Sequence, residues 1–280
     1  MRVTADTALA EYAAAVMPWL LRDPVRNNQL LTLLQSRLDG VVLPESELLM
    51  LRVVDEGGAV AAVAVRPPPF AMLLSDLPDE AVPPLAAHLA GGGQRVTRFT
   101  GPPEQTGRLA AALAGRAGGR ASMLAAYRMF EICEVSPPAG VTGRPREAAG
   151  ADRDQLVAWS AAFQREALAD HPRTDPAAPI DGRLALGGLL WVWEAGGEPV
   201  AMTAMTAPAA GVVRINLVYT PPRRRANGYA SALVAAVSRA ALAAGLRPVL
   251  FTDLANPTSN KIYQAIGYRP VQDTGMWEVG

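Results

Sequence analysis

Short runs of apolar residues recur along the whole chain, and their period switches repeatedly between that of a helix and that of a strand. Apolar residues recur at helical spacing over 7–20 and 25–38. The runs at 48–54 and 59–65 flank a Glu-Gly-Gly turn at 56–58, which predicts a β-hairpin. The rest of the first half predicts strands over 70–74, 94–99 and 121–135 and helices over 78–89 and 103–114.

A second alternation begins after the Ser-Pro-Pro-Ala-Gly segment at 136–140, the clearest linker in the chain. We therefore predict two domains, residues 1–136 and 141–280, of the α/β (α+β) class, each with a mixed, mainly antiparallel sheet flanked by helices. Their similar order of elements suggests an ancient duplication. The second domain is predicted to contain strands over 144–148, 189–194, 200–207, 212–219, 249–254 and 268–279, helices over 152–169, 228–244 and 258–266, and a loop over 174–182.

Length and composition favour two well-packed globular domains. The chain has 280 residues, of which 50% are hydrophobic and 19% charged, so it can bury substantial cores. Its 26 basic and 26 acidic residues give a formal net charge of zero. That balance argues against a broad electrostatic surface for nucleic acid or anionic lipid.

The sequence contains few potential metal ligands and no evident export signal. Cys133 is the one cysteine, so a disulfide within the chain is excluded. We expect Cys133 to be buried in a strand. With His88 and His171 as the two histidines, a histidine-based metal site is not expected. Neither a signal peptide nor a membrane-spanning stretch is evident. These features predict a cytoplasmic protein without a metal.

One segment carries the pattern of an anion site. The apolar run 212–219 leads into a Pro-Pro pair, then an arginine triplet at 223–225, and then Gly228, which opens an amphipathic helix. The first turn of a helix has about four backbone N–H groups without intrahelical partners. Its dipole, at about 0.3–1 kcal/mol, is too weak to hold a ligand, whereas several N–H bonds to charged oxygen at roughly 1.5–3 kcal/mol each suffice. The segment therefore predicts a phosphate site.

Two further motifs narrow the choice of phosphate ligand. Neither a Gly-Lys-Ser/Thr nucleotide pattern nor a Gly-x-Gly-x-x-Gly dinucleotide pattern is present. The pattern Arg225-x-x-Gly228-x-Ala230 instead resembles the pyrophosphate loop of the GCN5-related N-acetyltransferase (GNAT) superfamily, and its surroundings resemble a bacterial branch. The segment from Asn256 to Tyr268 resembles a second GNAT element at the expected spacing. The resemblance covers 191–280 well, whereas the first half shares only the order of elements and is expected to be a degenerate GNAT-like domain without cofactor.

The resemblance implies an acetyl-CoA site between central strands that splay apart. Leu217, Val218 and Tyr219 would pair their backbone with the pantetheine arm, Asn256 and Asn260 would hydrogen-bond it, and Tyr263 would lie near the thioester sulfur. The residues expected around the pyrophosphate are Arg223, Arg224, Arg225, Ala226, Asn227, Gly228, Tyr229, Ala230 and Ser231.

Acyl transfer to an amine needs a neutral amine, a stabilised oxyanion and a stabilised thiolate. A backbone N–H of Val218 or Tyr219 would serve the oxyanion, and the Tyr263 phenol would serve the thiolate as proton donor. The general base that would take the proton of the amine is less clear. Members of the family often have a Glu on this strand, whereas this chain has Asn216, which cannot take a proton. Glu166 is the best alternative for the base, and Asp170 and His171 are nearby candidates. A water relay without a dedicated side chain also fits. If Glu166 is not the base, we expect it to lie on a solvated helix face or to pair with an arginine.

We therefore expect an N-acetyltransferase that moves an acetyl group from acetyl-CoA to a primary amine by direct attack in a ternary complex. The acceptor is a small-molecule or peptide amine that the sequence does not identify. Two alternatives stay open: a CoA-binding or regulatory module without catalysis, and an enzyme for a longer acyl-CoA. No nucleic-acid or membrane partner is expected, and the protein would be a monomer or homodimer.

Overall fold

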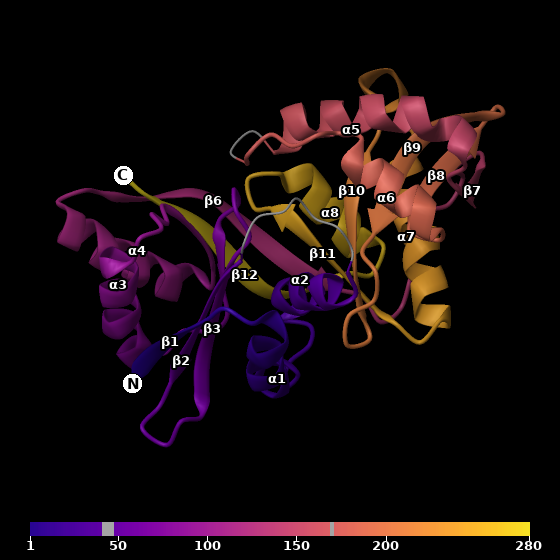
Figure 1. Cartoon of the computed structure of the whole chain (residues 1–280). Coiled ribbons are helices and arrows are strands. Elements are labelled where there is room, and N and C mark those ends of the chain that lie inside the picture. The colour runs from indigo at the N-terminus through magenta and orange to yellow at the C-terminus, as the bar shows by residue number, and fades with distance from the viewer. Residues whose placement is uncertain (41–47, 169–170) are drawn as a thin grey trace. The chain divides into compact units, whose positions relative to one another are not determined.

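The computed structural model describes residues 1–40, 48–168 and 171–280. The chain forms two compact units, each described below by itself (Figure 1). The first unit consists of Met1–Met129, Asp253–Ala255 and Val271–Gly280, and the second of Phe130–Thr252 and Asn256–Pro270. The last ten residues therefore lie with the first unit. The predicted division into 1–136 and 141–280 places them in the second domain instead.

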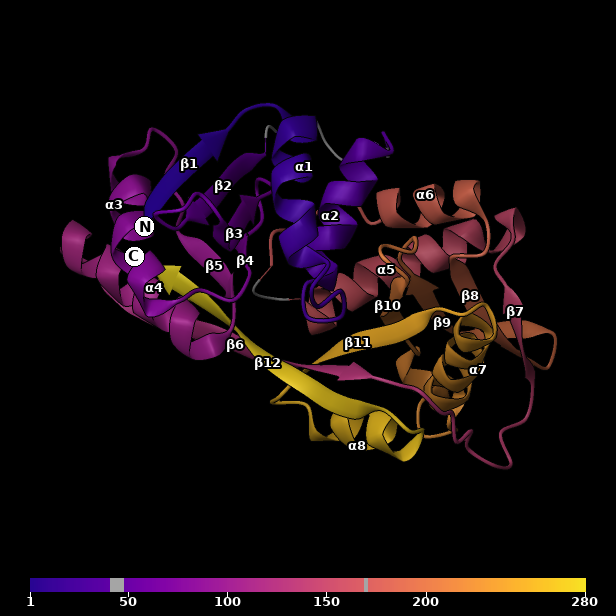
Figure 2. The same ribbon diagram turned by 90° about the horizontal axis from the view of Figure 1, so that it is seen from below.

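The first unit is a sheet with helices on its faces. Its strand order is β1-β2-β3-β4-β5-β12-β6. Helices α3 and α4 pack together, and α1 and α2 form a second helical pair (Figure 2). The elements are β1 Arg2–Asp6, α1 Leu9–Leu20, α2 Asn28–Leu38, β2 Leu49–Val54, β3 Val60–Arg66, β4 Met72–Leu74, α3 Val82–Gly91, β5 Arg98–Gly101, α4 Pro103–Ala117, β6 Ala121–Glu131 and β12 Arg269–Val279.

Most elements predicted for the first half are present, with two differences. Strand β1 was not predicted, because its five residues contain no apolar run longer than one residue. The last strand of the chain, β12, pairs antiparallel with β5 from Gly275–Gly101 to Glu278–Arg98. The expectation of a buried Cys133 is wrong: the residue follows the end of β6 and is exposed.

The second unit carries the segment with the candidate chemistry. Its strand order is β11-β10-β9-β8-β7, antiparallel except for the parallel pair β10–β11. The elements are β7 Arg144–Glu147, α5 Arg153–Ala167, α6 Ala178–Leu186, β8 Leu190–Ala195, β9 Glu198–Met205, β10 Val212–Tyr219, α7 Tyr229–Ala243, β11 Arg247–Asp253 and α8 Pro257–Ala265. Helix α6 occupies half of the segment 174–182 for which a loop was predicted, and that prediction is wrong.

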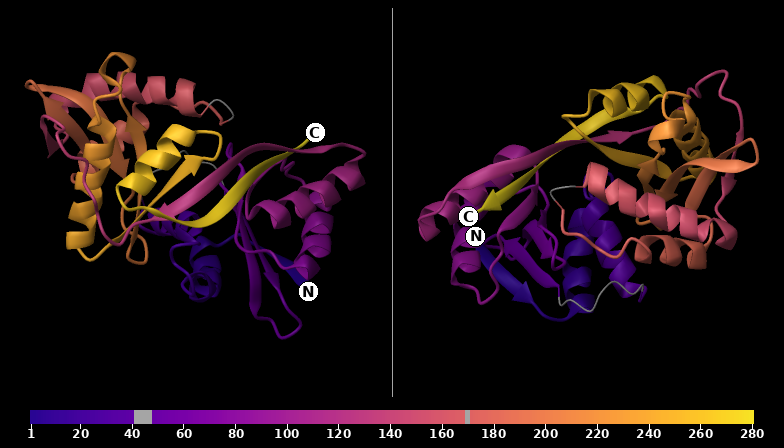
Figure 3. Two further views of the ribbon diagram at one scale, coloured as in Figure 1. Left: turned by 180° about the vertical axis from the view of Figure 1, so that it is seen from behind. Right: turned by 90° about the horizontal axis from the view of Figure 1, so that it is seen from above.

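Apolar residues form one core on each face of this sheet. One core lies under α7 and α8 and includes Leu233, Val237 and Tyr263. The other lies under α5 and α6 and includes Leu156 and Ile180. Figure 3 shows α5 and α6 side by side. Because successive residues of a strand point to opposite faces, β10 presents its residues alternately to the two helical layers.

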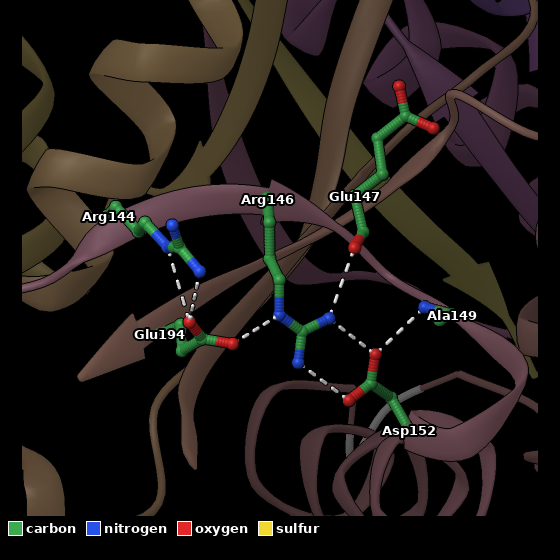
Figure 4. Close-up of polar contacts among 6 residues, drawn as sticks. All are labelled: Arg144, Arg146, Glu147, Ala149, Asp152 and Glu194. Carbon is green, nitrogen blue, oxygen red and sulfur yellow. Dashed lines mark hydrogen bonds and ion pairs between the residues drawn. The ribbon is translucent and has the colours of Figure 1, made fainter. Parts of the chain in front are cut away.

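A network of charged groups fixes the start of α5 (Figure 4). The Arg146 guanidinium on β7 donates to both carboxylate oxygens of Asp152, at 2.7 and 2.9 Å, and to Glu194 Oε2 on β8 at 2.6 Å. Asp152 also accepts from the Ala149 N–H at 2.8 Å. Hydrogen bonds from Arg146 lower the pKa of Asp152 and of Glu194. The aspartate therefore ends the short 3-10 turn before α5, and anchors this helix to the edge of the sheet.

A tight turn after α8 depends on Gly267. This residue has φ +109°, and a Cβ atom on it would lie 2.3 Å from the backbone oxygen of Glu134. The turn leads directly to Tyr268, a buried side chain whose hydroxyl is 2.8 Å from Ser238 Oγ on α7. Close backbone approach at Gly267 thus holds α8 in place against the core.

We expect Gly267→Ala to lower the free energy of unfolding by well over the roughly 1–2 kcal/mol that a left-handed conformation costs a residue with a Cβ. The additional loss comes from the clash with Glu134. Gly245→Ala is the matched control, since Gly245 has φ +74° but no atom within 4 Å of a Cβ. Denaturant unfolding of both variants measures the difference, and equal losses would contradict this account of the turn.

Candidate active site

Strand β10 parts from β11 halfway along its length. The parallel pairing runs from Val212–Arg247 to Ile215–Leu250. In the described part of the chain, no residue of β10 beyond Ile215 has a partner on β11. The carboxyl ends of the two strands thus leave backbone groups of β10 without their neighbour in the sheet, which agrees with the predicted splaying of central strands.

The same stretch of β10 contains a β-bulge against β9. Asn216 pairs with Ala204, and the next pair is Tyr219 with Met202, so β10 advances three residues while β9 advances two. Leu217 lies within this step and has φ +52°. Bulges bend a strand and redirect its side chains, and they are frequent beside active sites. Leu217 and Val218 have no Cα partner on β9 or β11, which suits a role in binding an extended ligand.

The loop after β10 is held by its own polar contacts. A 3-10 turn over Pro222–Arg224 follows the strand, and Asn227 Nδ2 donates to the backbone oxygens of Arg224 and Arg225 at 3.1 and 2.9 Å. Ala226 and Gly228 both have positive φ, at +64° and +75°. Alternation of this kind turns successive N–H groups toward one concave surface, an arrangement that binds anions.

The N–H groups of this loop and of the first turn of α7 are available to a ligand. In the described residues, none of the backbone N–H groups from Ala226 to Ser231 donates to a protein acceptor; the first bond of the helix runs from Ala232 N to Gly228 O at 2.9 Å. Gly228 is the N-cap, so no side chain caps the helix. Within the stretch expected around a pyrophosphate, the residues from Ala226 to Ser231 therefore form a continuous row of donors at a helix N-terminus, whereas the N–H groups of Arg224 and Arg225 already donate to Pro221 and Pro222.

The three arginines of the loop have different surroundings. Arg223 is exposed, and Arg224 Nη2 is 3.1 Å from Glu198 Oε2. Arg225 Nη2 donates to Glu166 Oε2 at 2.6 Å, and its Nε donates to Thr220 O at 2.9 Å. Its guanidinium carbon lies 5.9 Å from the centre of the Tyr219 ring. Arg225 therefore has the most contacts of the three, Arg224 has the single partner Glu198, and Arg223 is exposed.

Glu166 has an arginine partner in this structure. Its carboxylate accepts from Arg225 and, at 3.2 Å, from the Tyr219 hydroxyl, and the hydrogen bond from Arg225 is the main cause that lowers the pKa of Glu166. Burial raises the pKa of Tyr219. The contact links the end of α5 to the loop between β10 and α7. Of the other two candidates for the base, Asp170 lies outside the described residues, and His171 follows the end of α5.

The predicted asparagine pair lies at the start of α8. Asn256 is the N-cap, and its Oδ1 accepts from Ser259 N at 3.0 Å. Asn260 donates from Nδ2 to Asn256 O at 2.8 Å, and its Oδ1 accepts from the Thr252 hydroxyl at the end of β11. Both amides thus have a structural role: Asn256 caps α8, and Asn260 fixes α8 to the end of β11, the strand that parts from β10.

Tyr263 lies one turn further along α8, in the core under α7. It is 9% exposed, and its ring packs edge-on against that of Tyr268, with centroids 6.0 Å apart. Burial raises the pKa of the Tyr263 phenol to about 12. Its hydroxyl has no hydrogen-bond partner among the described residues. The phenol is therefore protonated at neutral pH, and its hydroxyl is available as a donor.

Sequence reasoning missed Arg183, which contacts the bulged strand from α6. Its Nη2 donates to Asn216 Oδ1 at 3.3 Å, and its Nε and Nη1 donate to the backbone oxygens of Met205 and Pro179 at 3.2 and 2.8 Å. Pro179 stands in the first turn of α6, a position that proline favours. That proline was the available signal for the helix, whereas the contact with Asn216 has none in the sequence.

Comparisons with known proteins agree with the fold of this chain. Residues 154–268 match the family model described as acetyltransferase (GNAT) family. Similar solved structures include a Drosophila protein (TM-score 0.69, 12% identity, 99% of this chain and 98% of that one) and an acetyltransferase from the GNAT family of Colwellia psychrerythraea (TM-score 0.65, 9% identity, 100% and 99%). A GCN5-related N-acetyltransferase from Sphaerobacter thermophilus gives a TM-score of 0.60 at 16% identity over 99% and 95%. At these identities the likeness concerns the fold.

A search of curated proteins gave no match. Among the helices in the described ranges, none combines the length and apolar character that crossing a membrane requires.

We expect Arg225→Ala to raise the pKa of Glu166 toward that of an ordinary glutamate, because the first cause of its lowered value is removed. Titration of the carbon-13-labelled side-chain carboxyl by NMR measures it. Arg224→Ala is the matched control, since Arg224 pairs with Glu198 and leaves Glu166 untouched. An unchanged pKa of Glu166 in the Arg225 variant would show that the ion pair is not formed in solution.

Proposed function

We propose that this chain, whose residues 154–268 match the GNAT acetyltransferase family model, is an enzyme of the N-acetyltransferase type that moves an acetyl group from acetyl-CoA to a primary amine of an acceptor. The observation that carries the proposal is the row of free N–H donors from Ala226 to Ser231, directly after a strand that has left its neighbour. These two features together suit a ligand that has both an anionic group and an extended polar chain.

The residues present fit coenzyme A. The donors of the loop and the oriented Arg225 would hold the pyrophosphate, for which charge-assisted bonds of roughly 1.5–3 kcal/mol each are available. The backbone of Leu217, Val218 and Tyr219 would pair with the pantetheine amides, as the lack of strand partners at the bulge favours. Asn256 and Asn260 would lie along the arm, although the second already uses its amide within α8.

Bound acetyl-CoA supplies the acetyl group as a thioester, which an amine attacks directly while both are bound. Tyr263 would donate its phenolic proton, or a hydrogen bond, to the departing sulfur. A phenol with a pKa near 12 remains protonated across the neutral range, so it is always ready as a donor. The N–H of Val218 or Tyr219, at the bulge, would donate to the carbonyl oxygen of the acetyl group.

Glu166 would take the proton of the attacking amine, directly or through a water molecule. Its lowered pKa keeps it ionised, which attracts an ammonium group but also makes it a weak base while Arg225 is bound. Because the pyrophosphate would compete for Arg225, Glu166 is a better base once the cofactor has bound. The arginine contact also favours a second candidate function, a CoA-binding module without catalysis, in which Glu166 serves only to orient the loop.

We further propose that residues 141–280 alone bind the cofactor. The first 136 residues have no counterpart of the pattern Arg-x-x-Gly-x-Ala. One cofactor per chain is the stoichiometry that this division requires.

Calorimetric titration of acetyl-CoA tests the cofactor site. We expect binding at one site per chain, and its loss in Gly228→Glu, which brings an anion to the expected position of the pyrophosphate. Gly228→Ala is the matched control: it has the same strain at φ +75° and the same Cβ close to Val141, without the charge. Circular dichroism checks that both variants fold. If the unaltered protein does not bind, the proposal fails; if the glutamate variant binds normally, the site lies elsewhere.

Tyr263→Phe tests catalysis. We expect kcat to fall by roughly 10²–10⁴-fold, the usual value of a general acid, with the Kd of acetyl-CoA almost unchanged. Tyr268→Phe is the control, because it removes the neighbouring phenol, whose hydroxyl bonds Ser238 and has no role in the reaction. The readout is the rate of free CoA release with the best amine of a panel. A protein that binds acetyl-CoA but acetylates no amine would favour the non-catalytic module.

A further inference from the structure

The Tyr219 hydroxyl makes a contact that the proposed mechanism does not use. It donates to Glu166 Oε1 at 3.2 Å, whereas Arg225 Nη2 donates to the other carboxylate oxygen, Oε2, at 2.6 Å. Each oxygen of the carboxylate therefore has one partner of its own. In the proposed mechanism only the backbone N–H of Tyr219 takes part, so its side chain has no assigned role.

Tyr219 is the best-fixed member of this group of three residues. It is 7% exposed, while the side chains of Glu166 and Arg225 keep 44% and 49% of their surface in solvent. Its ring centroid lies 6.2 Å from that of Trp159 on α5, and its backbone pairs with Met202 on β9 after the bulge. The sheet and the core under α5 thus hold the Tyr219 hydroxyl, whatever the position of the Arg225 side chain.

The ion pair between Arg225 and Glu166 is, in contrast, easily exchanged. An ion pair whose partners are both nearly half in solvent contributes little, because water screens it and two long side chains lose their freedom. Charge-assisted bonds from a guanidinium to a phosphate group are stronger and often bidentate. A bound pyrophosphate would therefore draw Arg225 away from the carboxylate. Of the two partners of Glu166, the Tyr219 hydroxyl would then remain.

Glu166 needs such a partner to keep its orientation. It stands in the last turn of α5, and its long side chain is largely in solvent, so only a contact restricts its rotamers. The position of a reacting group matters, because a displacement of about 1 Å can slow a reaction roughly 10²-fold. A bond from Tyr219 to Oε1 leaves Oε2, the oxygen that Arg225 would vacate, open to an incoming amine.

We propose that Tyr219 is a positioning residue for Glu166: its hydroxyl holds Oε1, so that Oε2 takes the proton of the acceptor amine once Arg225 has left. The inference rests on the proposed function, in which Glu166 is the base. In this step the N–H bond of the amine breaks, its electron pair stays on nitrogen, and Glu166 becomes a neutral carboxylic acid. Tyr219 keeps its own proton, because burial raises the pKa of its phenol.

The groups around Glu166 give this role a distinctive signature. The hydrogen bond from Arg225 is the main cause that lowers the pKa of Glu166, and burial raises it. The bond from Tyr219 and the positive charge of Arg165, its neighbour on α5, lower that pKa further. Loss of the Tyr219 hydroxyl should therefore raise the pKa of Glu166 and make it a stronger base. A slower reaction in the same variant would then reflect lost orientation.

NMR titration of the carbon-13-labelled Glu166 carboxyl tests the contact without cofactor or catalysis. In Arg225→Ala, which lacks the competing partner, Tyr219→Phe should raise the pKa of Glu166 further. Phenylalanine keeps the ring beside Trp159 and the backbone N–H proposed for the oxyanion. Tyr268→Phe in the same background is the matched control, since this phenol lies in the other core and should leave Glu166 unaffected. An equal pKa with and without the Tyr219 hydroxyl would overturn the proposal.

The release of Arg225 is measured in the unaltered protein. Saturation with CoA should raise the pKa of Glu166, because the pyrophosphate takes the guanidinium that lowers it. In Arg225→Ala the same addition should raise it less. If CoA binds and the pKa of Glu166 does not change, Arg225 stays on the carboxylate, and the proposed order of events is wrong.

A double-mutant cycle tests the role in the reaction. We expect Tyr219→Phe to lower kcat by up to about 10²-fold, with the Kd of acetyl-CoA almost unchanged in calorimetry. In Glu166→Gln, whose amide cannot take a proton, the same substitution should have almost no effect on kcat, because a positioning residue acts through the group that it holds. An unchanged kcat in Tyr219→Phe, or an equal loss in both backgrounds, would overturn the proposal.

Failure of the proposed function has a different signature. The unaltered protein would then not bind acetyl-CoA in calorimetry, or would bind it and acetylate no amine. In either case the titration of Glu166 in Arg225→Ala still decides whether the Tyr219 hydroxyl holds the carboxylate: a higher pKa in the added presence of Tyr219→Phe supports the contact, and an unchanged one refutes it.

Discussion

Beyond Ile215, β10 loses its pairing with β11 and gains one residue relative to β9, and the arrangement of the candidate site follows from that change. A strand paired on both sides offers no backbone groups to a ligand, whereas a strand that parts from its neighbour does. The bulge at Leu217 also changes which face of the sheet each later side chain meets. Asn216, before the bulge, contacts Arg183 on α6, and the extra residue lets Tyr219, three positions later, meet the same helical layer and reach Glu166 on α5. The bulge and the lost pairing of β10 thus leave backbone groups without partners and also determine which helices the nearby side chains contact.

The electrostatics of the loop build on this geometry. Backbone N–H groups are fixed donors that need no reorganisation when an anion arrives, and Asn227 holds the turn that aligns them. Arg225 adds a full charge, but in the absence of an anion it is neutralised by Glu166 at 2.6 Å. Cofactor binding and the state of Glu166 are then coupled, because both compete for one guanidinium. Such a coupling would keep the carboxylate occupied until the cofactor is in place.

The sequence predicted those parts of the site that are encoded by neighbouring residues. The strand 212–219, the loop with its arginines and Gly228, and the helix after it are local features, governed by turn chemistry and periodicity, and the structure has all of them. The bulge could not be predicted, since it needs the register of β10 against β9. Arg183 was missed because a short helix that begins with Ala-Pro and contains Gly182 shows weak periodicity. Its contact with Asn216 spans 33 residues, which no local pattern encodes.

Asn216 places an amide on β10 where Arg183 of α6 contacts the strand. In family members an acid often stands at this point of the strand and serves as the base. A carboxylate here would form an ion pair with Arg183, which would lower its pKa, weaken it as a base and neutralise the arginine. The amide has nearly the same shape, but it accepts one hydrogen bond without cancelling the charge. Thus the residue that removes the usual base also leaves Arg183 positively charged. An amide cannot take a proton from the attacking amine, so the proposed mechanism needs its base elsewhere, and Glu166 on α5 is the carboxylate proposed for it.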